Sequence, residues 1–276
     1  MSSSSPSLPV IAFLGGGNMA RSLVGGLVAR GADPARIHVA EPVPELRQAL
    51  AADFGVQVHA AAARAVADAG MWVLAVKPQV MHSLCGELAG VAAAARPLLV
   101  SIAAGITVAR LQQWLGGDAA VVRCMPNTPA LLGAGVTGLY AGPGVDARQR
   151  EDAEAVLAAA GATVWIDEEP LMDSVTAVSG SGPAYVFLLA EAMQAAAGDE
   201  GLDPDQARTL VVHTLLGAAR MLAETGEPAG ELRRRVTSPG GTTQAAIESF
   251  QADGFEALVA RAIHAARVRG AELAGG

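Results

Sequence analysis

Short apolar runs alternate with helical patterns along the first 167 residues. Each run is bounded by turn-forming residues, which is typical of a buried strand, and the segments between the runs have the apolar spacing of helices. Strands that alternate with helices predict a mostly parallel, doubly wound α/β sheet. The expected strands are residues 10–14, 37–40, 71–76, 98–102, 121–125 and 163–166, and the clearest helices are 21–30, 44–54, 81–91 and 108–115.

The strand pattern ends at Asp167, and the remaining chain has the pattern of helices at 184–197, 203–224 and beyond Thr242. The middle helix is apolar on nearly every side, and such a helix is buried from several directions. A helical domain of about a hundred residues can hardly achieve this alone. We therefore expect two domains, residues 1–167 and 168–276, and expect the second to interlock with another copy of the chain in at least a homodimer.

A glycine-rich turn of the form G-x-G-x-x-A follows the first expected strand and precedes the first expected helix. Gly15 permits a tight turn, Gly17 lets the backbone approach a pyrophosphate, and Ala20 allows close helix–strand packing. The helix N-terminus offers free N–H groups and a positive dipole to the anion. This context favours dinucleotide binding, with Asn18 and Met19 beside the glycines, over the alternative of a structural turn.

In an open α/β sheet the ligand lies outside the carboxyl ends of the strands. Glu41 follows the second strand, where an acid accepts hydrogen bonds from the adenosine ribose and repels a 2′-phosphate, which favours NAD over NADP. The alternative is an exposed surface acid. Lys77 and Pro78 follow the third strand, small residues at 101–105 follow the fourth, and Asn127 lies between two prolines after the fifth. Each of these segments alone is also compatible with a tight turn.

Two further glycine-rich segments, residues 178–185 and 236–243, lie in the helical half. We expect each to be a turn that places hydroxyls and free N–H groups at a helix N-terminus, an arrangement that suits a carboxylate ligand. The alternative at either place is ordinary capping by Ser or Thr. Two such segments in one small domain favour a ligand site.

The composition, 51% hydrophobic and 17% charged, excludes disorder except at the ends. The net charge of −8 without a basic stripe argues against nucleic acid. Cys85 and Cys124 have no metal-site spacing and fit a reducing compartment. We find neither a secretory signal nor an apolar run long enough to span a membrane. We therefore expect a soluble, cytoplasmic protein without a metal, a nucleic-acid partner or a membrane partner.

No acid–base catalyst is evident among the candidate residues. The five histidines have no partner motif, and no carboxylate pair or Ser-His arrangement is visible. We therefore expect a reaction that positioning alone accelerates, such as hydride transfer to an electrophilic centre.

Together these motifs resemble those of the pyrroline-5-carboxylate reductase family, in the family's order and from Pro9 to Ala274. The resemblance implies NAD(P)H-dependent reduction of 1-pyrroline-5-carboxylate to L-proline, the last step of proline synthesis. It implies a Rossmann domain followed by an all-helical domain that interlocks in a dimer, which some members assemble further into decamers. The matching segments are residues 15–20, 75–79, 101–105, 125–129, 177–185 and 236–243.

By position, the resemblance implies that residues 15–19 hold the pyrophosphate and that Ala75, Val76, Lys77, Pro78 and Ala104 border the nicotinamide half. It implies that the Thr243 hydroxyl is the catalytic group and hydrogen-bonds to the ring nitrogen of the cyclic imine. The implied substrate contacts are Val178, Ser179, Gly180, Ser181, Gly182, Ser238, Gly241, Thr242 and Thr243.

Two departures from the family bear on the coenzyme. Ala62 stands where the family often has an asparagine near the adenosine, and Glu41 stands where many members have small or polar residues for the 2′-phosphate. The choice between NADPH and NADH therefore stays open.

Two other functions compete with this reading. A 3-hydroxyacid-type dehydrogenase is expected to have a lysine on a helix of its second domain, but Lys77 is the only lysine in the chain. A non-enzymatic dinucleotide-sensing protein would leave both C-terminal glycine-rich segments unexplained. A regulatory protein that binds pyridoxal phosphate would need an available lysine, and Lys77 is already assigned to the coenzyme.

Overall fold

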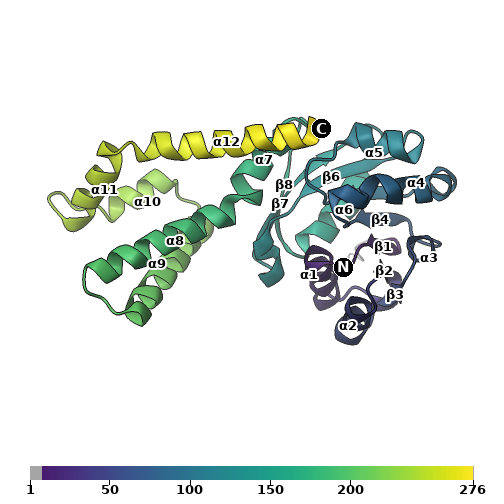
Figure 1. Cartoon of the computed structure of the whole chain (residues 1–276), viewed down its shortest axis with the longest axis horizontal. Helices are drawn as coiled ribbons and strands as arrows, with labels where there is room; N and C mark the ends of the chain where they lie inside the picture. Colours follow the sequence, from purple (N-terminus) through teal and green to yellow (C-terminus); the bar gives the residue numbers. More distant parts are fainter. Residues whose placement is uncertain (1–7, 276) are drawn as a thin grey trace, which may run out of the picture. The chain divides into compact units, whose positions relative to one another are not determined.

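The computed structural model describes residues 8–275. Contacts divide the chain into two units, Met1–Ser181 with Ala266–Gly276, and Gly182–Ala265 (Figure 1). This division falls later than the boundary predicted at Asp167. Residues beyond Asp167 stay with the first unit because Glu169 and Asp173 form ion pairs with Arg123 of the sheet.

An eight-stranded sheet forms the centre of the first unit, in the order β3-β2-β1-β4-β5-β6-β7-β8. Its neighbouring strands are parallel except for the antiparallel pair β6 and β7. The order 3-2-1-4-5-6 is that of dinucleotide-binding folds, which confirms the predicted fold class. The strands are β1 (Ile11–Leu14), β2 (Ile37–Ala40), β3 (Gln57–His59), β4 (Met71–Leu74), β5 (Leu98–Ser101), β6 (Val121–Met125), β7 (Gly135–Ala141) and β8 (Gly161–Trp165).

Side chains alternate between the two faces of each strand and supply two separate cores. Ile11 and Phe13 of β1 lie in the core formed with α1, α2 and α6, whereas Ala12 and Leu14 lie in the core formed with α3, α4 and α5. The helices are α1 (Asn18–Ala29), α2 (Pro44–Phe54), α3 (Ala62–Ala65), α4 (Pro78–Ala95), α5 (Val108–Leu115) and α6 (Ala147–Ala158), with 3-10 turns at Pro34–Arg36 and Thr128–Leu132.

Strands β3 and β7 and helix α6 are absent from the elements predicted by pattern. The sequence pattern did not predict β7 because this strand contains glycines, which are rare in strand interiors. Here they serve close packing: a Cβ on Gly135 would lie 2.8 Å from the nitrogen of Ala130, and one on Gly138 would lie 2.6 Å from a methyl group of Val175.

The second unit is helical, as predicted. It contains α8 (Gly182–Asp199), α9 (Pro204–Thr225), α10 (Ala229–Arg235), α11 (Thr242–Ala252) and the first part of α12 (Phe255–Gly275). Helices α8 and α9 lie side by side (Figure 1). The Asp203–Gln206 capping box starts α9, and Gly226 in the left-handed conformation ends it.

Much apolar surface of the second unit is uncovered in a single chain. Of α9, only Ala207 and Val211 are buried. Large apolar side chains that are exposed on several neighbouring helices mark an interaction surface. They include Val186, Phe187, Leu188, Leu210, Leu216, Leu222 and Leu258.

Candidate functional site

The glycine loop joins β1 to α1 at the carboxyl edge of the sheet. Gly15 has a φ of +106°, and a Cβ there would lie 2.8 Å from the carbonyl oxygen of Ala75, so this position requires glycine. At Gly17 a Cβ would meet no atom within 4 Å, and no side chain caps the N–H groups where α1 begins at Asn18. An open cradle with uncapped helical N–H groups fits a pyrophosphate. Met19 packs its side chain against the core, which leaves its backbone for the ligand.

Glu41 lies at the end of β2 and is only 7% exposed. Its Oε2 accepts the backbone N–H of Gly16 at 2.9 Å, and its Oε1 accepts the N–H of Val43 at 2.9 Å. The alternative of an exposed surface acid is therefore wrong. The bond to Gly16 was not predicted, because a contact between the loop and the next strand end depends on the folded register. Arg47 donates to the carbonyl oxygens of Glu41 and Pro42 at 2.7 and 3.1 Å.

A cavity of about 410 Å³ opens beside this loop. Gly15, Ala40 and Pro42 line one part of it, and Val76 lines another. The rest of the wall was not predicted, although its four α4 members recur at helical spacing. These further residues are Leu14, Ala60, Ala61, Ala62, Val80, Ser83, Leu84 and Glu87.

The other strand ends at this edge hold the remaining predicted coenzyme residues of the first unit. Lys77 is the N-cap of α4 and Pro78 its first residue, and both are exposed. Ala104 is exposed in the turn after β5, next to Gly105 with a φ of +75°. The structure thus gathers these residues at one edge of the sheet.

Asn127 has a different environment from the predicted one. Its side chain is largely buried, its Oδ1 accepts the N–H of Val136 at 2.9 Å, and its Nδ2 donates to the carbonyl oxygen of Ser179 at 3.2 Å. Both ends of the amide are thus bonded within the protein. A coenzyme contact by Asn127 stays a prediction. It would use the second N–H of the Asn127 side-chain amide.

The expected glycine turn at residues 178–182 is wrong. Helix α7 (Leu171–Val175) continues into a π-helical segment, Thr176–Gly180, and α8 begins at Gly182. Neither glycine there adopts a positive φ, and the N–H of Ser181 donates to the carbonyl oxygen of Thr176 at 2.8 Å. The segment is thus helical backbone. A Cβ on Gly180 would lie 2.6 Å from the terminal methyl of Met125, so a larger residue there would require the Met125 side chain to move.

The second glycine-rich segment, residues 236–243 in the helical unit, forms the turn that was predicted. Gly240 has a φ of +69°, and the N–H of Gly241 donates to the carbonyl oxygen of Ser238 at 3.0 Å. Helix α11 begins at Thr242 without a side-chain cap. Its first N–H groups, including those of Thr242 and Thr243, therefore stay available to an anion.

Three comparisons with known proteins identify the family. A protein from Pseudomonas aeruginosa named pyrroline-5-carboxylate reductase is 55% identical over 97% of this chain and 98% of its own. The chain belongs to the pyrroline-5-carboxylate reductase family. The family model "pyrroline-5-carboxylate reductase dimerisation" matches residues 169–273, and "NADP oxidoreductase coenzyme F420-dependent" matches residues 10–105.

Solved structures of family members have the same fold. The reductase from Coxiella burnetii is 41% identical with a TM-score of 0.94, covering 96% of this chain and 98% of that one. The Plasmodium falciparum reductase, solved with NADP bound, is 25% identical with a TM-score of 0.84, covering 98% of this chain and all of that one. The predicted family resemblance is confirmed.

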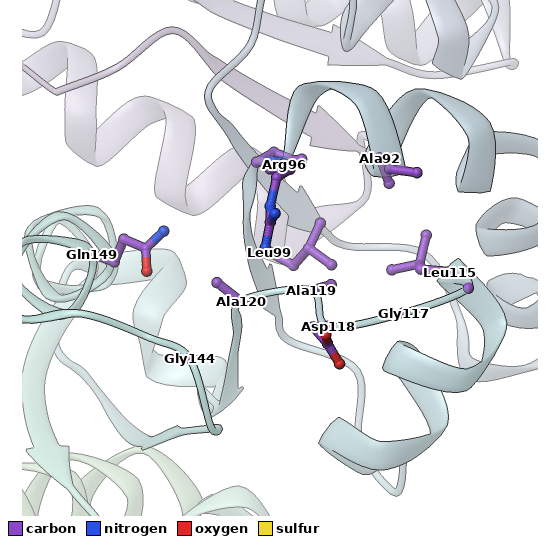
Figure 2. A pocket seen from close by; sticks show the side chains of 13 residues that line it. Ala92, Arg96, Leu99, Leu115, Gly117, Asp118, Ala119, Ala120, Gly144 and Gln149 are labelled. Atoms are coloured by element: carbon purple, nitrogen blue, oxygen red, sulfur yellow. The ribbon is translucent and has the colours of Figure 1, made fainter.

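This family member has a second cavity, of about 430 Å³, at the opposite edge of the sheet. Figure 2 shows it among Arg96, Asp118 and Gln149. It lies before β5 and β6, whereas ligands of open α/β sheets bind at the carboxyl ends. Among the residues that the structure describes, no buried polar side chain lines it. We therefore place the functional site at the glycine-loop edge.

Residues 8–275 contain no group of three or more His, Cys, Asp and Glu side chains that could hold a metal ion. Over the same residues, no helix combines the length and apolar character needed to cross a membrane.

Proposed function

We propose that this chain catalyses NAD(P)H-dependent reduction of 1-pyrroline-5-carboxylate to L-proline. The observation that carries the proposal is 55% identity over 97% of the chain to a protein named for this activity. The open cradle at Gly17 and the uncapped start of α1 support coenzyme binding independently of that identity.

Bound at the glycine loop, a reduced nicotinamide dinucleotide supplies the hydride that reduces the C5=N bond. Residues Gly15 to Met19 hold the pyrophosphate. The N–H groups of Gly17, Asn18 and Met19 are its donors, because those of Gly15 and Gly16 already bond to Ala40 and Glu41. We place Ala75, Val76, Lys77, Pro78, Ala104 and Asn127 along the nicotinamide half.

At the start of α11, Gly241, Thr242 and Thr243 receive the substrate carboxylate, whose charge is favoured by the helix N-terminus. The N–H groups of Thr242 and Thr243 are its donors, and Gly241, whose N–H bonds to Ser238, leaves the approach open. The Thr243 hydroxyl hydrogen-bonds to the ring nitrogen and orients the imine. A protonated cyclic imine accepts hydride readily, so solvent suffices as the proton source. The remaining substrate contacts in this proposal are Val178, Ser179, Gly180, Ser181, Gly182 and Ser238.

We also propose a functional division at Asp167, with residues 1–167 for the coenzyme and 168–276 for substrate and dimerisation. The dimerisation model, which begins at residue 169, supports this boundary. The uncovered apolar side chains of the second unit support a homodimer. A mass of two chains in solution agrees with a dimer, a mass of ten with a decamer, and a mass of one contradicts both. Free, buried Cys85 and Cys124 support a cytoplasmic location.

The test is oxidation of NADH or NADPH by the purified protein with and without 1-pyrroline-5-carboxylate. We expect oxidation only with the imine, and formation of proline. Coenzyme binding without any imine-dependent oxidation would remove this function and favour a dinucleotide sensor. Reduction of NAD⁺ or NADP⁺ with a 3-hydroxyacid instead would favour the dehydrogenase alternative.

A further inference from the structure

We propose that Glu41 makes this enzyme prefer NADH to NADPH, because its carboxylate both clamps the glycine loop and accepts the hydroxyls of the adenosine ribose. This inference rests on the proposed coenzyme site at the glycine loop. It departs from the Plasmodium falciparum relative, which was solved with NADP bound.

The position of the carboxylate is fixed by the backbone. The N–H groups of Gly16 and Val43 each donate to one oxygen at 2.9 Å, and the residue is 7% exposed. A Cβ on Gly16 would lie 3.0 Å from the Cβ of Glu41 and 2.7 Å from a methyl group of Leu50. The loop and the acid therefore fit each other closely, and the carboxylate has one orientation.

The remaining acceptor sites suit hydroxyls and exclude phosphate. An ionised carboxylate has about four lone-pair sites and no donor, and the two backbone bonds use one site on each oxygen. Each oxygen therefore keeps a site for a ribose hydroxyl. A 2′-phosphate has no hydroxyl to donate at neutral pH and would bring a second negative charge within hydrogen-bond distance.

No cation offsets this charge at the carboxylate. Within residues 8–275, no Arg, Lys or His forms an ion pair with Glu41. Arg47 is the neighbouring cation, but its Nη1 bonds to the carbonyl oxygens of Glu41 and Pro42 rather than to the carboxylate. Its charge therefore secures the turn after β2.

Glu41 also lies beside the space that an adenosine would occupy. Its two sequence neighbours, Ala40 and Pro42, line the cavity of about 410 Å³, together with Gly15 of the loop. The rest of the lining includes the small and apolar side chains Ala60 to Ala62, Val80 and Leu84, which suit the face of a base, together with Ser83 and Glu87. The acid is thus flanked by two lining residues of this cavity, and we place the adenosine ribose next to them.

The experiment is calorimetric titration of the full-length protein with NADH and NADPH, and with ADP-ribose and 2′-phospho-ADP-ribose, which lack the nicotinamide. We expect the wild type to bind each ligand without the 2′-phosphate at least about tenfold more tightly than its phosphorylated counterpart. Glu41→Ser should lower that ratio by about tenfold or more, and Glu41→Gln should lower it with the side-chain size kept. Both variants lose part of the loop clamp, so both should also bind NADH more weakly.

Asp118→Asn is the matched control, because Asp118 is exposed at the opposite edge of the sheet and its loss changes the net charge equally. In this variant, the ratio of the Kd values with and without the 2′-phosphate should equal that of the wild type. Equal or tighter binding of NADPH by the wild type would overturn the proposal, even if the Glu41 variants do not fold. An unchanged ratio in folded Glu41→Ser would also overturn it.

This outcome is separable from that of the proposed reaction. Imine-dependent oxidation with a preference for NADPH would keep the reaction and reject the role of Glu41. The expected binding ratio without any oxidation would keep the role of Glu41 and reject the reaction.

Discussion

The side-chain amide of Asn127 donates a hydrogen bond to the carbonyl oxygen of Ser179 at 3.2 Å. This bond ties the loop after β6 to the π-helical segment, and the close approach of Met125 to Gly180 adds a second link between them. π-Helical segments are frequent at functional sites. Here the segment contains family-motif residues, so the amide supports a part of the site that it does not itself form.

Replacement of Asn127 should therefore destabilise the fold. In Asn127→Leu, the N–H of Val136 and the carbonyl of Ser179 lose their partner, which costs about 1–3 kcal/mol. Asn127→Asp keeps an acceptor for Val136 but turns a largely buried carboxylate oxygen toward the Ser179 carbonyl oxygen, so it should be destabilised as well. Urea unfolding at one fixed protein concentration measures both changes. Wild-type stability in Asn127→Leu would show that the amide is dispensable.

Two glycines of the loop should respond differently to alanine. Gly17→Ala fills only open space, so the melting temperature should stay within about 2 °C of wild type while the Kd for NADH rises about tenfold or more. Gly15→Ala meets the Ala75 carbonyl at a positive φ and should lower the melting temperature itself. Thermal melts and coenzyme titrations separate the two effects. Unchanged coenzyme affinity in Gly17→Ala would contradict the pyrophosphate cradle.

Arg123 of β6 is buried and pairs with Glu169 and Asp173 at 3.2 and 3.4 Å. Arg123→Met leaves two carboxylates without their cation, so we expect a loss of about 3 kcal/mol in the free energy of unfolding. Arg148→Met removes a long pair, 3.8 Å, in which Arg148 is exposed and Asp152 is half-buried, and should cost less than about 0.5 kcal/mol. Denaturant titration of the two variants makes the comparison. Equal losses would mean that burial of the Arg123 pair is irrelevant.

Thr243→Ala should lower kcat/KM for the imine about tenfold or more, because the ring nitrogen loses a hydrogen bond. The Kd for NADH should not change, and Thr243→Ser should restore most of the rate. Thr237→Ala is the control, because the Thr237 hydroxyl already donates to the carbonyl oxygen of Arg233. Steady-state kinetics and coenzyme titrations are the measurements. An equal loss of coenzyme affinity would remove Thr243 from the substrate side.

Stability should fall in acid partly through His59. Burial lowers the pKa of His59 below its ordinary value, and the nearby charges of His38 and Arg64 add to this. The unfolded chain therefore takes up the proton at a higher pH than the folded chain. The contribution of His59 is full above about pH 6.5 and is lost as the pH falls toward the folded pKa.

The free energy of unfolding, measured in urea at pH 7.5 and pH 5.5 (~2 units apart, to bracket the ordinary His pKa), tests this. The acid-induced loss should be smaller in His59→Gln than in the wild type. His82→Gln is the control, since His82 is exposed in the same unit. A loss in His59→Gln as large as that of the wild type would exclude His59 as a cause.

Periodicity predicted the elements whose side chains are segregated by face. Strand β2 and helices α2 and α5 have the predicted bounds because apolar positions and capping residues agree there. Strand β7 could not be predicted, since its glycines serve contacts with Ala130 and Val175 that exist only in the folded chain.

In the candidate site, too, the features set by local sequence were predictable and those set by distant contacts were not. The loop at Gly15 and Gly17 and the turn before Thr242 follow from local glycine chemistry, and the structure has both. The π-helical segment has the composition of a turn, yet its backbone is helical, with the N–H of Ser181 bonded to the carbonyl oxygen of Thr176. The partners of Glu41 and Asn127 come from distant segments, so sequence could place these residues at strand ends but could not assign their hydrogen bonds.

The most direct test of the account follows the hydride itself. The purified protein is incubated with 1-pyrroline-5-carboxylate and NADH deuterated at both C4 positions, and the proline formed is examined by mass spectrometry and NMR. The account predicts one deuterium per proline, located at C5. Proline without deuterium, or no proline while the coenzyme binds, would contradict it.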